Sequence, residues 1–182
     1  MRARYLIGLV VGLVLVAVAA VNVAFASSQG GGATVKTKES VKIAINKYIQ
    51  DGLYYVPGTV TVTSGSTLTF TYSDKEQDPH TLTIVNKAEL PRTAAQVFRC
   101  APCRKYTTSH LKNPHAPPGP GNPIVNWTLN QGQPGFDAPG DSMAIQPGAH
   151  KRNSVVISAP SGTTLYFLCA VHAWMQGKII VK

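Results

Sequence analysis

The feature that most constrains the fold of this chain is a Cys-x2-His-x2-Met motif near its C-terminus, formed by Cys169, His172 and Met175. The motif lies between two apolar stretches that predict strands, residues 164–169 before it and 178–181 after it. Because side chains alternate along a strand, Cys169 shares a face with the apolar residues of its own strand and is expected to point into the core. One short loop between two strands therefore presents a thiol, an imidazole and a thioether together.

A fourth candidate ligand, His80, comes from a distant part of the chain. It opens the stretch 80–85, in which large apolar residues alternate with threonines. This pattern predicts a strand with His80 on the core face at one end. One thiolate and two imidazoles, with a weak thioether, form the ligand set that suits a single copper ion cycling between its cuprous and cupric states. We therefore predict that His80, Cys169, His172 and Met175 bind one copper ion.

Simpler interpretations exist for each of these residues alone, since a buried Cys or Met is most often a core side chain. The combination is what favours a metal site. A dinuclear copper centre would need a second Cys four residues from Cys169, but Leu165 and Ala173 stand at those positions.

With these ligands the chain resembles the cupredoxins, the small blue copper proteins that include plastocyanin, azurin and amicyanin. The resemblance runs from about residue 41 to residue 182, interrupted by one long insertion, and includes the stretches 55–70 and 141–150. It implies an all-β fold, a Greek-key sandwich or barrel, and a type 1 copper site that transfers electrons without being an enzyme. It also implies that electrons pass through His172, whose neighbours Val171, Ala173 and Trp174 are apolar.

Further strands are expected over residues 41–49, 59–63, 67–72 and 154–158, which are short and bounded by turn residues. Short strands at such spacing are typical of an antiparallel sandwich or barrel. We expect one domain over residues 37–182, which is long enough to form a single hydrophobic core.

The insertion spans residues 87–140. Residues 90–99 predict a short helix, whereas the Pro-rich stretch 113–123 is compatible with neither helix nor strand. A connection this long is uncommon in a compact domain, so it is either functional or poorly ordered.

Two cysteines of the insertion, Cys100 and Cys103, allow several interpretations. Outside the cytoplasm a local disulfide is the plainest of them. A metal site with His110 and His115 and a redox-active dithiol are the alternatives. Covalent haem attachment is excluded because Arg104 stands where that motif requires His.

The N-terminus predicts export. Residues 1–26 contain two arginines, an apolar run and an Ala-x-Ala pattern, which together indicate a signal peptide or a membrane anchor. In the second case residues 5–26 attach the protein to the membrane. In both cases the domain lies outside the cytoplasm, as a periplasmic, secreted or outer-face-anchored protein. Residues 27–36, rich in glycine, predict a flexible linker.

Charge constrains the partners only coarsely. The formal net charge is +9, and basic residues gather around residue 40 and in the insertion. Such a surface favours acidic redox partners or an anionic membrane, although an ordinary solvated surface would look similar. Nucleic acid is not expected as a partner, because the chain is expected to be exported and contains no nucleic-acid-binding motif.

The sequence therefore predicts an extracytoplasmic one-electron carrier with a mononuclear type 1 copper site. Two alternatives stay open. A copper-trafficking protein would use the same ligands and release its ion readily, and a copper redox enzyme would need a substrate site formed by the insertion.

Overall fold

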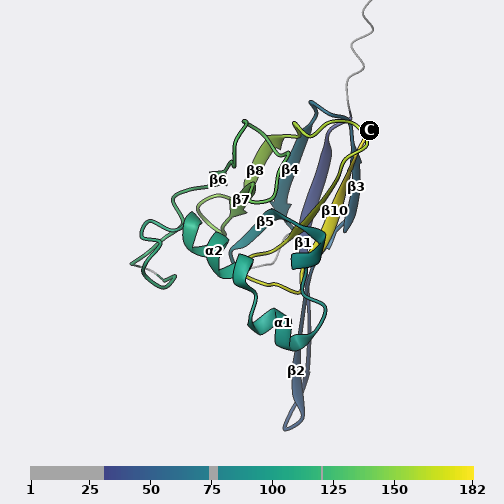
Figure 1. Cartoon of the computed structure of the whole chain (residues 1–182). Helices are drawn as coiled ribbons and strands as arrows, with labels where there is room; N and C mark the ends of the chain where they lie inside the picture. Colours follow the sequence, from purple (N-terminus) through teal and green to yellow (C-terminus); the bar gives the residue numbers. More distant parts are fainter. Residues whose placement is uncertain (1–30, 74–77, 120) are drawn as a thin grey trace, which may run out of the picture.

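The computed structural model describes residues 31–73, 78–119 and 121–182, and its strands form two sheets that enclose one core (Figure 1). The four-stranded sheet has the order β2 (Tyr48–Val56), β1 (Ala33–Ala44), β4 (Thr67–Tyr72) and β8 (Arg152–Val156). The six-stranded sheet has the order β3 (Thr59–Val62), β10 (Gln176–Val181), β9 (Thr164–Leu168), β5 (His80–Val85), β7 (Ser142–Ile145) and β6 (Thr128–Leu129).

The core forms where the inward faces of the two sheets meet. Val35 and Phe70 from the first sheet and Leu82, Phe167 and Ile179 from the second are fully buried. Burying one such side chain contributes about 1.5–3 kcal/mol. The prediction of an all-β sandwich with one long insertion is confirmed.

The sheets are mixed, which corrects the expectation of a purely antiparallel sandwich. β1 pairs with β4 in parallel, and β10 pairs with β3 in parallel. The chain leaves the first sheet after β2, forms β3 in the second and returns as β4. The two strands of each parallel pair are therefore not joined by a hairpin, and their relative direction is not fixed by a turn.

The N-terminal part differs from the prediction in two ways. The stretch 41–49 is not one strand, because β1 and β2 form a long hairpin that turns at Asn46. Asn46 has a φ of 60°, a left-handed conformation that asparagine adopts more readily than most residues. In addition, β1 begins at Ala33, inside the predicted linker 27–36, because Val35 is buried and pairs with Phe70 of β4.

The insertion folds into a 3-10 turn and two helices, η1 (Lys87–Glu89), α1 (Ala94–Phe98) and α2 (Ala101–His110). α1 lies within the predicted helix, whereas α2 was not predicted. α2 packs against β5, whose six residues are all buried. The threonine face of β5 is therefore covered by the insertion. The described residues of the stretch 113–123 contain no helix and no named strand, as expected.

The predicted signal peptide or anchor, including the attachment through residues 5–26, lies outside the described residues. Over residues 31–73, 78–119 and 121–182, no helix combines the length and the apolar character needed to cross a bilayer.

Candidate metal centre

Two neighbouring strands bring His80 and Cys169 to the same edge of the six-stranded sheet. β5 and β9 run antiparallel with Thr83 opposite Leu168, so the beginning of β5 meets the end of β9. His80 is the first residue of β5, and Cys169 directly follows β9. Both side chains are fully buried.

His172 and Met175 follow in the loop that leads to β10. The Met175 N–H donates to the His172 carbonyl at 2.8 Å, and the Met175 carbonyl accepts from the Cys169 N–H at 3.0 Å. These bonds close the loop over the thiol. Met175 is 1% exposed and packs in the core with Cys169, whereas His172 is partly exposed.

The three strongest candidate ligand atoms form a compact triangle. The Cys169 Sγ lies 3.7 Å from the His80 Nδ1 and 3.8 Å from the His172 Nδ1, and the two nitrogens are 3.2 Å apart. Among the described residues, these three are the group of His, Cys, Asp or Glu side chains placed to hold a metal ion.

This triangle has the size that one small metal ion requires. Zinc binds imidazole nitrogen at about 2.0–2.1 Å and thiolate sulfur at about 2.3 Å. If an ion with such bond lengths lay in the plane of its three ligands, the two nitrogens would be about 3.5 Å apart, and each would be about 3.8 Å from the sulfur. The observed distances are close to these values. Two imidazoles and a thiolate with a nearby thioether favour copper over harder ions. The group therefore fits one copper ion, and Met175 would add a weak thioether ligand.

The protonation states of the ligands also suit a cation. Burial, and then the neighbouring His172, lower the pKa of His80 to about 3. Burial lowers the pKa of His172, although Asp78 and Asp51 oppose this shift. Both imidazoles are thus neutral near pH 7, which is the form in which a histidine binds a metal. Burial raises the pKa of the Cys169 thiol, while hydrogen bonds led by that from the Thr81 N–H oppose the shift. A bound cation would replace this thiol proton.

Thr81, the residue after His80, holds the two ligand-bearing strands together. Its hydroxyl accepts from the Ala170 N–H at 2.7 Å, and its own N–H points at the Cys169 Sγ at 3.4 Å. Both contacts are buried, so they position the thiol without competition from water.

A buried chain of hydrogen bonds continues from Thr81 to the insertion. The hydroxyls of Thr81 and Thr83 are 2.9 Å apart, and those of Thr83 and Ser142 are 2.7 Å apart. The Ser142 hydroxyl lies 2.8 Å from the His110 Nε2, and the His110 Nδ1 contacts the Asn126 carbonyl. The Asn126 carbonyl can only accept, so the neutral His110 ring carries its proton on Nδ1 and accepts from the Ser142 hydroxyl at Nε2. At the other end the Ala170 N–H can only donate, so each hydroxyl donates to the next group in the direction of His110.

Sequence reasoning did not identify Thr83, Ser142 and His110 as supporting residues. One signal was present, because threonines alternate along β5 and a polar face that becomes buried needs partners. Nothing in the sequence, however, connects those threonines with α2 or β7.

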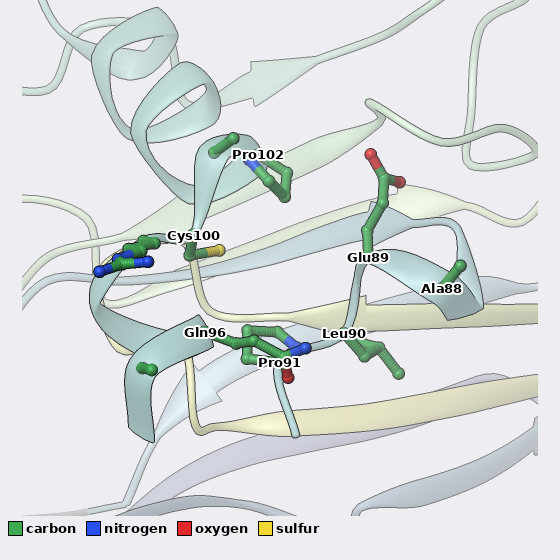
Figure 2. A pocket seen from close by; sticks show the side chains of 10 residues that line it. Ala88, Glu89, Leu90, Pro91, Gln96, Cys100 and Pro102 are labelled. Carbon is green, nitrogen blue, oxygen red and sulfur yellow. The ribbon is translucent and has the colours of Figure 1, made fainter. Parts of the chain in front are cut away.

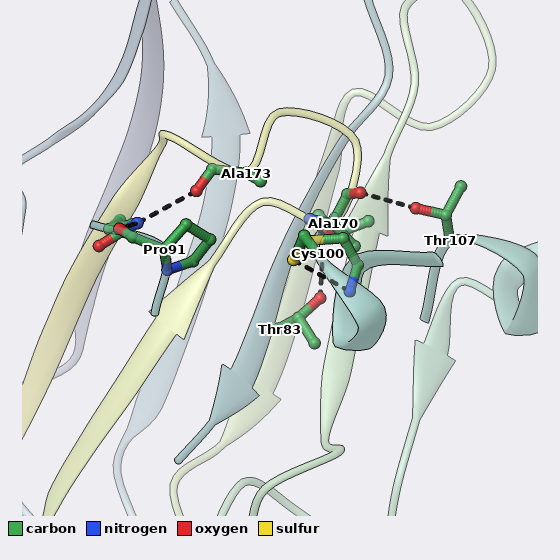
Figure 3. Close-up of a disulfide and its surroundings, with 9 residues drawn as sticks. Thr83, Pro91, Cys100, Thr107, Ala170 and Ala173 are labelled. Atoms are coloured by element: carbon green, nitrogen blue, oxygen red, sulfur yellow. Dashed lines mark hydrogen bonds between the residues drawn. A yellow bond between two sulfur atoms is a disulfide. The ribbon is translucent and has the colours of Figure 1, made fainter. Parts of the chain in front are cut away.

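The insertion also contacts the ligand loop directly (Figure 3). The Thr107 hydroxyl donates to the Ala170 carbonyl at 2.8 Å, and the Gln176 amide donates to the carbonyls of Pro91 and Ala173 at 2.8 and 3.1 Å. Both sides of the ligand loop are therefore fastened to the insertion.

Cys100 and Cys103 form a disulfide with a Cα–Cα distance of 5.2 Å. Cys103 packs in a small hydrophobic cluster with Ala170 and Ala173 of the ligand loop, and Cys100 lies against it. The pair is thus structural in this fold. His110 binds Ser142 instead of joining a metal site with the two cysteines.

A cleft of about 260 Å³ separates η1 from α1 and the start of α2 (Figure 2). Its carboxylate, Glu89, accepts hydrogen bonds from the backbone and side-chain amides of Asn86. Among its described lining residues, no histidine, serine or threonine accompanies that carboxylate, so they do not resemble an acid–base site.

A two-sheet sandwich with this ligand group at one edge is the arrangement of the cupredoxins, and the resemblance found in the sequence extends to the structure. The sequence matches no family model, and no curated protein is significantly similar to it.

Solved structures similar to this one include a purple cupredoxin and two auracyanins. The purple cupredoxin, from Nitrosopumilus maritimus, is 12% identical, with a TM-score of 0.41, 82% of this chain covered and 99% of the other. The auracyanin from Roseiflexus castenholzii is 17% identical, with a TM-score of 0.41 and 83% and 96% covered. Auracyanin A from Chloroflexus aurantiacus, described as a "blue" copper protein, is 18% identical, with a TM-score of 0.43 and 84% and 100% covered.

Proposed function

We propose that this protein is an extracytoplasmic one-electron carrier that uses a single type 1 copper ion. The observation that carries the proposal is the triangle of the Cys169 Sγ and the two Nδ1 atoms of His80 and His172, closed by the loop that holds Met175. Copper bound there would supply the one-electron chemistry.

The supports around the triangle suit repeated electron transfer. His80 and Cys169 are fully buried, and Thr81 joins their strands. A ligand set that cannot move far reorganises little when an electron arrives or leaves. His172 is the partly exposed member, and its ring packs against Trp174 at 5.3 Å between centroids. Electrons would therefore enter and leave at the His172 edge.

An extracytoplasmic location is supported by two features. Residues 1–26 have the composition of a signal peptide or anchor. The Cys100–Cys103 disulfide is a bond that oxidising compartments favour.

A copper redox enzyme is the second candidate, and one cavity favours it. This cavity, of about 380 Å³, lies between the insertion and the site and is lined by Thr81, His110 and Val171 among others. The ligand group opposes this candidate, because four protein ligands leave no open position for a substrate.

An absorption spectrum combined with a redox titration of the copper-loaded protein tests the proposal. We expect an intense visible thiolate-to-copper band that disappears and returns in one reversible one-electron step. A protein that binds copper stoichiometrically without this band, or that loses it irreversibly on reduction, would not be the proposed carrier.

A further inference from the structure

A groove with a volume of about 950 Å³ lies between the insertion helices and the ligand loop, beside the candidate copper site. α1 and the first two turns of α2 form one wall, and Ala170, Val171, Ala173 and Trp174 form the other. Cys100, Ala170 and Ala173, which line this groove, are labelled in Figure 3. The insertion therefore does more than support the ligand loop, because it also builds a surface beside it.

Large apolar side chains line this groove and remain in contact with solvent. Phe98 is 88% exposed, Trp174 44% and Val171 37%. Exposed aromatic and aliphatic side chains gathered in one concave surface indicate a site of protein interaction. Phe98 ends α1, and its exposure shows that it contributes almost nothing to the core.

The charges in the groove have one sign. Arg99, Arg104 and Lys105 are exposed and line it, and no aspartate or glutamate is among its described lining residues. No carboxylate in the described part of the chain forms an ion pair with any of the three. The groove therefore combines an apolar surface with three exposed cations, and a partner that fits it has apolar and acidic groups side by side.

The groove adjoins the exposed edge of the candidate site. Val171 immediately precedes His172, and the Trp174 ring packs edge to face against the His172 ring. A protein held in the groove would thus lie beside the imidazole through which electrons would pass. We propose that the groove docks an electron-transfer protein whose contact face is acidic and apolar. This inference rests on the proposed electron-carrier function and names the kind of partner for it.

The first test includes the metal-free protein, so its result does not depend on copper binding and separates this proposal from the proposed function. A synthetic peptide of alternating glutamate and leucine is titrated into the isotope-labelled protein, metal-free and in the cuprous form, and backbone amide shifts are followed by NMR. We expect shifts at the groove in both forms, and none with a peptide of alternating lysine and leucine. Shifts spread over other surfaces would overturn the proposal.

Two pairs of variants make the test specific. We expect the double variant Arg104→Glu/Lys105→Glu to bind the glutamate peptide about tenfold more weakly. The control is Lys36→Glu/Lys38→Glu, which makes the same change in net charge on exposed residues of β1 and should alter binding by less than about twofold. Phe98→Ser should weaken binding by about tenfold, whereas Ile45→Ser, at the 79% exposed hairpin tip, should leave it unchanged. Equal effects within either pair would contradict docking in the groove.

The second test measures electron transfer in the copper-loaded protein. At low ionic strength, the charge reversal at Arg104 and Lys105 should slow oxidation by hexacyanoferrate(III), an anion, by about tenfold, and should accelerate oxidation by the cation tris(phenanthroline)cobalt(III). Vesicles of phosphatidylcholine and phosphatidylglycerol form the last arm. Binding to these vesicles that depends on Phe98 and Arg104, without groove-specific peptide binding, would assign the groove to a membrane and overturn the protein partner.

Discussion

Cys169 is the residue on which the candidate site depends most. Its sulfur is one corner of the ligand triangle, and it is fully buried between His80 and the loop that carries Met175. Serine has nearly the same size but a hard oxygen donor, so the substitution tests the chemistry with little change in packing.

We predict that Cys169→Ser abolishes the visible absorption of the copper-loaded protein and leaves the sandwich folded. The band requires a thiolate bound to cupric ion, whereas the fold rests on the core formed by both sheets. Absorption and far-ultraviolet circular dichroism of the same samples check both parts. A variant that kept the band would remove Cys169 from the site.

Met175 is expected to tune the site. A thioether is a weak, soft donor that favours cuprous copper, and the amide oxygen of glutamine is harder. Met175→Gln should therefore lower the reduction potential while the protein keeps a coloured site. Voltammetry measures the change, and an unchanged or raised potential would contradict a ligand role for Met175.

At the scale of elements, α2 connects the insertion to the ligand strands through His110. Burial lowers the pKa of His110, although the hydrogen bond to the Asn126 carbonyl opposes the shift. As the pH falls, a histidine whose pKa is lower in the folded chain becomes protonated in the unfolded chain first, and this favours unfolding. Its contribution to stability is therefore complete above the ordinary pKa of 6.5 and is lost as the pH falls below it.

We predict that His110→Gln reduces the loss of stability of the metal-free protein between pH 7 and pH 5. The variant should also be less stable at pH 7 by about 1–3 kcal/mol, because glutamine cannot place a donor to the Asn126 carbonyl and an acceptor from the Ser142 hydroxyl where the two ring nitrogens lie. Urea unfolding at several pH values measures both effects. The exposed His115 gives the matched control, and a His115→Gln variant with the same change would contradict the assignment to His110.

The disulfide belongs to the same scale because it closes the first turn of α2. Removal of the cross-link by Cys100→Ser/Cys103→Ser should cost about 2 kcal/mol, the value expected for so short a loop. Since Cys103 packs against Ala170 and Ala173, the variant should also hold copper less tightly. Competition with a copper chelator measures the second effect, and mass spectrometry of the metal-free wild type should find one free thiol, at Cys169.

How far the sequence predicts these elements depends on whether their signal is local. Alternation along β4 and β5 predicted both strands with the bounds that the structure shows. α2 has a helical pattern too, since Cys103, Tyr106 and His110 are spaced to share one buried face. The sequence leaves that pattern ambiguous, because Cys and His are typical metal ligands as well as residues that can be buried in a core.

The candidate site follows the same rule. The three residues of the Cys169 loop are identified by spacing alone, and His80 by its place at a strand end. The chain from Thr83 through Ser142 to His110 joins three segments that are distant in sequence, and only the packing of α2 on β5 brings them together. No single-sequence pattern encodes a contact of that kind.

At the scale of the whole molecule, the ligand group lies where three parts of the structure meet. β5 and β9 deliver His80 and Cys169, the loop before β10 delivers His172 and Met175, and the insertion holds that loop from outside. A site supported on all sides should change little between its two oxidation states and should release its ion slowly. An electron carrier needs both properties, whereas a copper-trafficking protein must release its ion readily.

The last prediction separates these two functions. The copper-loaded wild type should pass through many voltammetric cycles without loss of signal, because each cycle moves one electron and leaves all four ligands in place. Metal analysis of the same samples should then find one copper ion per chain. Incubation with a metal-free copper acceptor protein should remove copper only slowly, since Cys169 and His80 are fully buried and must be exposed before the ion can leave. Loss of copper within a few cycles, or prompt transfer to the acceptor, would rule out the carrier and favour copper trafficking.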